Sequence, residues 1–219
     1  PTRQFNWAFE TVPQPGLNGR RGYQPRGKTL GGSSSINAMM YIRGHRCDYD
    51  HWAALGNTGW SYEDLLPLFR QSENNADLRD AYHGNSGPLH VSYLRSPSPF
   101  FQLCIDAALQ LGFKPNPDFN GAEQDGIGYT QVMQVNGERC SAAKAFITPN
   151  LARGNLQVET NAHATRILFD GKRAVGVEYR QGGQLRQIRA RREVILAAGA
   201  LQSPQLLLLS SIGDGEALR

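Results

Sequence analysis

A run of glycine, serine and asparagine from Gly27 to Met40 constrains this chain most strongly. It contains the pair Gly31-Gly32, three consecutive serines and Asn37, and it leads directly into Met39-Met40-Tyr41-Ile42 without a further spacer. Paired glycines permit close backbone approach, and short polar side chains leave N–H and hydroxyl groups free to bind oxygen atoms. A flexible Ser/Gly linker would continue into polar residues instead. We therefore predict a loop that cradles a polyanionic, ring-bearing cofactor of the flavin kind.

The second half of the chain carries strand patterns. Alternation over residues 164–169, 174–179 and 184–190, with turn residues at 170–171 and 182–183, predicts a three-stranded meander, and residues 155–160 predict a short strand. The continuous apolar run 193–199 stops at a glycine before a helical pattern over about 203–211. This is typical of a buried parallel strand that enters a helix.

The first half carries helical patterns. The spacing predicts helices over 48–55, over 62–72 with Ser61 as N-cap, and over 99–111, ended by Gly112. The third helix is expected to bury the stripe Phe101, Cys104, Ile105, Ala108 and Leu109. Residues 73–86 are polar and predict a loop, and residues 89–93 alternate and predict a strand.

Composition excludes several classes of protein. The chain has 219 residues, 40% of them hydrophobic, with a net charge of +4 that forms no dense basic stripe, so we expect no nucleic-acid partner. Cys47, Cys104 and Cys140 match neither a disulfide framework nor a metal site, which favours a reducing compartment. No apolar run reaches the roughly 18 residues of a membrane span.

Two segments resemble the signatures of one enzyme family. Residues 25–37, with Tyr41-Ile42-Arg43-Gly44 and Asp48-Tyr49-Asp50-His51-Trp52, resemble the first signature of the glucose-methanol-choline (GMC) oxidoreductases, flavoenzymes that oxidise alcohols. Residues 199–213 resemble the second signature, except that Ser211 stands where the family usually has glycine. The amino-acid sequence of residues 57–62 and 83–89 most resembles the choline-dehydrogenase-like and alcohol dehydrogenase branch of the family.

The resemblance implies a mixed α/β fold in which a dinucleotide-type FAD-binding domain is interrupted by a substrate domain with an antiparallel sheet. We expect residues 1–86 and 138–219 to belong to the FAD-binding domain and residues 87–137 to the substrate domain. Contacts to FAD, mostly through the backbone, are implied for Arg26, Gly27, Thr29, Leu30, Gly31, Gly32, Ser33, Asn37, Ala38, Met39 and Met40. Further contacts are implied for Ala164 on the adenine side and for Ala198, Gly199 and Ala200 near the pyrophosphate.

Three positions refine this expectation. Some relatives attach the flavin covalently through a histidine at the position of Ile36, which has no nucleophile, so FAD is expected to be non-covalent here. The amide of Asn37 is able to hydrogen-bond ring or ribitol oxygens. Arg139 resembles a family position at the border of the FAD-binding domain and is expected to form an ion pair.

The resemblance also implies that the chain is an internal piece of an enzyme. It contains neither the family's Gly-rich phosphate turn nor a histidine at the catalytic position, so no catalytic residue is expected among its five histidines, and no metal. The expected reaction is oxidation of a primary alcohol or choline-like substrate by hydride transfer to flavin N5, with a quinone or oxygen as acceptor. The missing N- and C-terminal parts of the same enzyme are expected partners, in the cytoplasm or at the inner bacterial membrane. A redox-silent lyase of the hydroxynitrile type and a non-catalytic folded fragment stay open.

Overall fold

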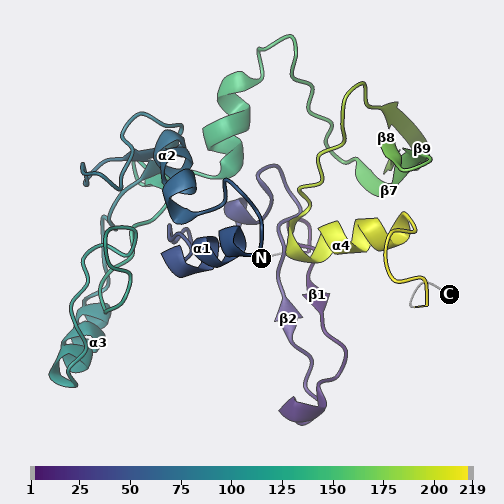
Figure 1. Cartoon of the computed structure of the whole chain (residues 1–219). Helices are drawn as coiled ribbons and strands as arrows, with labels where there is room; N and C mark the ends of the chain where they lie inside the picture. Colours follow the sequence, from purple (N-terminus) through teal and green to yellow (C-terminus); the bar gives the residue numbers. More distant parts are fainter. Residues whose placement is uncertain (1–2, 217–219) are drawn as a thin grey trace. The chain divides into compact units, whose positions relative to one another are not determined.

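The computed structural model describes residues 3–216, which form two compact units, one up to Leu156 and one from Gln157 onward. Helices alternate with small two- and three-stranded sheets (Figure 1), which confirms the mixed α/β class. Of the four sheets in the described residues, three are antiparallel and one is parallel.

The first unit opens with an antiparallel hairpin. Strands β1 (Phe9–Glu10) and β2 (Tyr23–Gln24) pair, and the 3-10 helix η1 (Pro15–Leu17) lies between them, so that the hairpin forms a long arm (Figure 1). A bridge between Asn6 and Gly27 continues this pairing. The arm therefore leads the chain directly into the glycine- and serine-rich loop.

Two helices of the first unit begin at capping boxes. Helix α1 (Arg46–Ala54) is capped by His45, and α2 (Tyr62–Ser72) by Ser61, whose hydroxyl accepts the N–H of Asp64. Each capping side chain satisfies an N–H group that has no partner inside the helix. Both predicted helices are confirmed, and Pro67 is accommodated inside α2.

Helix α3 (Pro99–Gln110) is confirmed, but its predicted buried stripe is wrong. Phe101 is 58% exposed and Cys104 is exposed, while Ile105 and Ala108 are half-buried. A helical face is buried only where another element covers it. Within residues 3–216, no element packs extensively on α3.

The predicted loop 73–86 is wrong at its start. Strand β3 (Glu73–Asn75) pairs in parallel with β4 (Leu89–Val91), which confirms a strand near the predicted 89–93. The unit is completed by β5 (Gln134–Val135), β6 (Glu138–Arg139), the π-helix η3 (Ala143–Ile147) and the 3-10 helix η4 (Thr148–Asn150). Polar side chains such as Glu73, Asn75 and His83 occupy much of its interior.

The second unit contains the predicted meander. Strands β7 (His163–Asp170), β8 (Arg173–Gln181) and β9 (Gln184–Arg189) pair in sequence order, and helix α4 (Gly199–Leu209) packs against β7 (Figure 1). The hydroxyl of Ser210 accepts the N–H of Ile167 at 2.8 Å.

Two predicted strands of the second half are absent from the described residues, at 155–160 and at 193–199. The apolar run 193–198 is followed by α4, which begins four residues earlier than expected, and Ile195 is 81% exposed. A buried parallel strand needs neighbouring strands and covering helices. The described residues supply no strand partner to this run, so its pattern alone does not make it a strand.

Candidate cofactor site

Residues 26–40, here called the cofactor loop, fold around a single turn of 3-10 helix. The turn η2 (Gly32–Ser35) starts from Gly31, whose φ of +87° is a left-handed conformation that favours glycine. A Cβ atom at Gly27 would lie 2.1 Å from the carbonyl oxygen of Gly32. Glycine at both positions is therefore required by the loop's own backbone.

The three serine hydroxyls form hydrogen bonds within the loop and to the neighbouring Ala142. The bonds are Gly27 N–H to Ser33 Oγ at 3.1 Å, Ser34 Oγ to the Gly31 carbonyl at 2.5 Å, Ser35 Oγ to the Leu30 carbonyl at 2.8 Å, and Ala142 N–H to Ser34 Oγ at 2.9 Å. The serines are thus part of the loop's own hydrogen-bond framework, and the Ser33 hydroxyl, which only accepts a hydrogen bond among the described residues, keeps its hydrogen available for a ligand.

Asn37 is held by its oxygen and leaves its amide nitrogen available. Its Oδ1 accepts the N–H of Met39 at 3.0 Å and Nη1 of Arg139 at 2.8 Å. Arg139 also donates to the carbonyl of Ser34 at 3.1 Å, so among the described residues it anchors the loop through neutral acceptors and makes no ion pair. Asn37 Nδ2 has no hydrogen-bond partner among residues 3–216, and the residue is exposed.

The loop presents backbone donors that suit a ligand rich in oxygen atoms. The N–H groups of Thr29, Leu30, Gly31 and Ala38 make no hydrogen bond within the described part of the chain. A Cβ at Gly32 would have no atom within 4 Å, so the backbone there is open to close approach. These features fit the phosphate, ribitol and ring oxygens of FAD.

The remaining predicted contacts belong to the second unit. Ala164 lies in β7 opposite Tyr179. Ala198 precedes α4 and donates its N–H to Ser203 Oγ at 3.0 Å, while Gly199, with a φ of +86°, and Ala200 form the first residues of the helix. A Cβ at Gly199 would also have no atom within 4 Å.

Beyond the cofactor loop lies a buried charged cluster, which we define as Arg43, Glu73, His83 and Asp118. Arg43 Nη2 lies 2.7 Å from Glu73 Oε2, and the side chains of both are almost fully buried. His83 joins two carboxylates, with Nδ1 2.9 Å from Glu73 Oε1 and Nε2 3.0 Å from Asp118 Oδ2. The N–H of Gly84 donates to Glu73 Oε2 at 3.0 Å.

The cluster holds His83 as an imidazolium. Burial lowers the pKa of His83, but hydrogen bonds to Asp118 and Glu73 and the charges of these carboxylates raise it to about 9. For Glu73, burial acts in the opposite direction and raises the pKa. The hydrogen bonds from His83, Asn75 and Gly84 and the charge of Arg43 outweigh this and bring the pKa of Glu73 below its usual value. Both ring nitrogens of His83 donate protons, so neither has a lone pair for general-base chemistry.

Three potential metal ligands lie close to one another at the cluster. Asp80, His83 and Asp118 bring one donor atom each within 4.8 Å of one another. A metal would have to replace the proton that His83 Nε2 donates to Asp118. The arrangement is that of an ion-paired histidine.

The charged cluster predicts a pH-dependent stability. The pKa of His83 is raised from 6.5 to about 9, so its contribution is fully present below pH 6.5 and is lost as the pH rises through about 9. One pKa unit corresponds to about 1.4 kcal/mol, which gives about 3 kcal/mol. We expect the difference in free energy of unfolding between the intact protein and its His83→Gln variant, measured with urea, to shrink by this amount between pH 6 and pH 10. A difference that stays constant over this range would contradict the assigned protonation.

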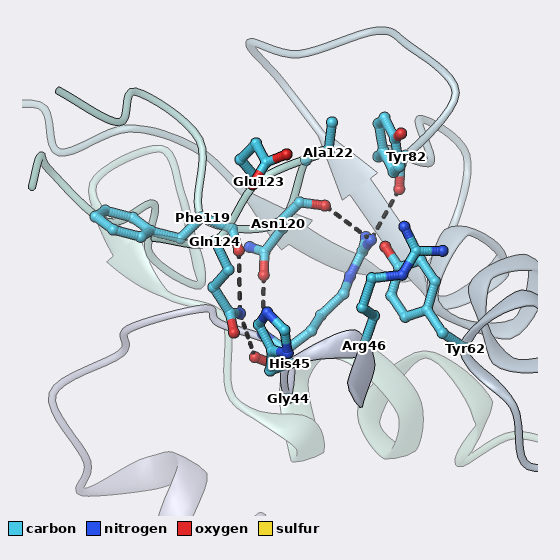
Figure 2. A pocket seen from close by; sticks show the side chains of 12 residues that line it. Gly44, His45, Arg46, Tyr62, Tyr82, Phe119, Asn120, Ala122, Glu123 and Gln124 are labelled. Carbon is cyan, nitrogen blue, oxygen red and sulfur yellow. Dashed lines mark hydrogen bonds between the residues drawn. The ribbon is translucent and has the colours of Figure 1, made fainter. Parts of the chain in front are cut away.

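A polar pocket of about 220 Å³ lies beside the cluster (Figure 2). Asn120 and Gln124 line it on one side and Arg46 and Tyr62 on the other. The backbone of Arg43 is tied to this pocket, since its N–H donates to Asn120 Oδ1 and its carbonyl accepts from Gln124 Nε2. Residues 43–46, which line the pocket, come shortly after the cofactor loop in the sequence. The hydrogen bonds of Arg43 therefore fix the backbone just beyond the end of that loop.

Among residues 3–216, no helix has both the length and the apolar character that crossing a lipid bilayer requires.

Comparison with known proteins gives consistent matches over almost the whole chain. The family model described as GMC oxidoreductase matches residues 9–218. The chain is 45% identical over 215 residues to oxygen-dependent choline dehydrogenase of Brucella ovis, covering 98% of this chain and 39% of that protein. It is 44% identical over 221 residues to alcohol dehydrogenase [acceptor] of Pseudomonas putida, covering 100% of this chain and 40% of that protein.

A solved structure agrees with these matches. The FAD-dependent oxidoreductase from Chaetomium thermophilum superposes with a TM-score of 0.91 at 32% identity, over 98% of this chain and 40% of that one. The chain thus spans about two fifths of the length of the proteins it matches.

Proposed function

Because this chain belongs to the GMC oxidoreductase family, whose cofactor is FAD, we propose that it is the central part of an FAD-dependent dehydrogenase or oxidase that acts on a primary alcohol or choline-like substrate. The observation that carries the proposal is the cofactor loop: a rigid turn with open backbone at Gly32 and unpaired N–H groups, in a chain similar to choline and alcohol dehydrogenases. When bound, FAD supplies the hydride acceptor for oxidation of the alcohol carbon.

We propose that the residues of this chain bind FAD and orient it. The proposed contacts in the cofactor loop are Arg26, Gly27, Thr29, Leu30, Gly31, Gly32, Ser33, Asn37, Ala38, Met39 and Met40. The second unit would contribute Ala164, Ala198, Gly199 and Ala200. Backbone N–H groups and the free Asn37 amide would hydrogen-bond the cofactor's oxygen atoms and so fix its orientation. The base that takes the hydroxyl proton would lie in the part of the enzyme beyond this chain.

The division into domains is also a proposal. Residues 1–86 and 138–219 would belong to the FAD-binding domain and residues 87–137 to the substrate domain. A location in the cytoplasm or at the inner bacterial membrane, and the use of a quinone or oxygen as electron acceptor, are further proposals that the resemblance to the family suggests.

The test is anaerobic reduction of the bound flavin. The intact protein that carries this chain is expected to be yellow, and choline or a primary alcohol is expected to bleach its visible absorbance without oxygen. If the protein released cyanide from a cyanohydrin and no alcohol bleached its flavin, the result would contradict the proposal and favour a lyase. A colourless protein that binds no added FAD would contradict it entirely.

The identity of Ile36 predicts the mode of cofactor attachment. Isoleucine has no nucleophilic atom, so FAD is expected to be released when the holoprotein is precipitated with acid. Absorbance at visible wavelengths should then appear in the supernatant and not in the protein pellet. Colour that stays with the washed pellet would show a covalent link and contradict the prediction.

A further inference from the structure

The end of the cofactor loop is held in a conformation that it would not adopt alone. Met39 has a φ of +64°, in the left-handed region that costs a residue with a Cβ atom conformational energy. Its carbonyl accepts the N–H of Met133 at 2.8 Å, and the N–H of Tyr41 donates to the carbonyl of Gln131 at 2.9 Å. The segment 39–41 is therefore held by the segment 131–133, which passes alongside it.

The segment 131–133 is itself fixed by a buried amide pair. Asn75 Nδ2 donates to Gln131 Oε1 at 2.7 Å, and Gln131 Nε2 donates back to Asn75 Oδ1 at 3.1 Å. The second hydrogen of Asn75 Nδ2 goes to Glu73 Oε1 at 2.9 Å. Both amides are buried, so their hydrogen bonds do not compete with water.

These contacts close a ring. The carbonyl of Gln131 binds the N–H of Tyr41, and Arg43, two residues after Tyr41, pairs with Glu73. Glu73 accepts a hydrogen bond from Asn75, and Asn75 binds the side chain of Gln131. Each member contacts two others in the ring. The amides of Asn75 and Gln131 both donate and accept, whereas the buried Nε of Arg43 has no hydrogen-bond partner among the described residues. Buried hydrogen bonds such as those of the amide pair favour one arrangement of the backbone segments that they join.

We propose that the Asn75–Gln131 amide pair is a positioning element for FAD: it connects the buried charged cluster to residues 39–41 and holds the end of the cofactor loop in its binding conformation. The proposal rests on the proposed function, because residues 39 and 40 must contact the cofactor. Gln131 and Asn75 act through the loop and are not catalytic residues.

The test compares Gln131→Met with the matched control Gln134→Met in the intact protein. Gln134 lies three residues further along and donates to Ser92 Oγ and the Tyr93 carbonyl, outside the ring. We expect Gln131→Met to raise the dissociation constant for FAD, titrated into the flavin-free protein, by about tenfold, since two buried hydrogen bonds are lost. The control should change it by less than about twofold. The visible circular dichroism of bound flavin should change in Gln131→Met only.

A milder variant keeps the test decisive if Gln131→Met does not fold. Gln131→Asn keeps an uncharged amide but draws it back by one methylene, which lengthens both hydrogen bonds to Asn75, and it should give a smaller change in the same direction. Unchanged affinity and flavin dichroism in a folded Gln131 variant, together with a lowered melting temperature, would show a purely structural contact and overturn the proposal. A parent protein that binds no FAD would instead overturn the proposed function, and this inference with it.

Discussion

Replacing Glu73 by alanine is expected to lower the free energy of unfolding by about 3–5 kcal/mol, the usual cost of removing one partner from a buried ion pair. Glu73 is fully buried and is the shared acceptor of Arg43, Asn75, His83 and the N–H of Gly84. Its removal leaves two buried cations with one carboxylate fewer. Since whole proteins are stable by about 5–15 kcal/mol, the substitution removes a large share of the stability that the protein has.

Urea unfolding of the flavin-free intact protein at pH 7 measures this effect. The control is Glu63→Ala, which removes an exposed carboxylate 3.0 Å from Arg46. Exposed pairs contribute little, so the control should change the free energy of unfolding by less than about 1 kcal/mol. Equal effects of the two substitutions would contradict the view that the charged cluster is a buried unit.

Gly27→Ala is expected to weaken FAD binding by about 5- to 100-fold. The added Cβ would overlap backbone atoms of Gly32 and Ser33, which a side-chain rotation cannot relieve, so the cofactor loop must shift. Overpacking of this kind costs about 1–3 kcal/mol, and each 1.4 kcal/mol is a factor of ten in affinity. Because the strain falls on the segment proposed to bind FAD, it should appear in the dissociation constant.

The control for this prediction is Gly16→Ala. Gly16 lies in η1, and a Cβ there would have no atom within 4 Å. Fluorescence titration of the flavin-free proteins with FAD should separate the two variants clearly. If Gly27→Ala bound FAD as tightly as Gly16→Ala, the cofactor loop would not be the binding segment.

Local sequence predicted the elements whose cause is local. Ser61 caps α2 because the residue three positions later completes a capping box, and the meander follows from alternation between two short turns. The position of the cofactor loop was predictable for the same reason, because its glycines are required by the conformation and contacts of neighbouring backbone. The role of its serines was not, because a hydroxyl serves a ligand or its own loop equally well.

The buried charged cluster could not be read from the sequence. Residues 73–86 are polar, and polarity predicts an exposed loop. Their burial depends on partners that are distant in sequence: Arg43 is 30 residues from Glu73, and Gln131 is 56 residues from Asn75. The run 193–199 illustrates the converse, because its apolar pattern predicts a strand that exists only if other strands lie beside it.

The contacts that fix the cofactor loop have a consequence for folding kinetics. Arg139 and Asn37 are 102 residues apart, and Ala142 and Ser34 are 108 apart. Such contacts of high contact order form late, since the entropy of closing a long loop must be overcome before they stabilise anything. During synthesis on the ribosome, the loop cannot reach its final conformation before residue 142 has emerged. Cofactor capture is therefore expected to follow the folding of the first unit.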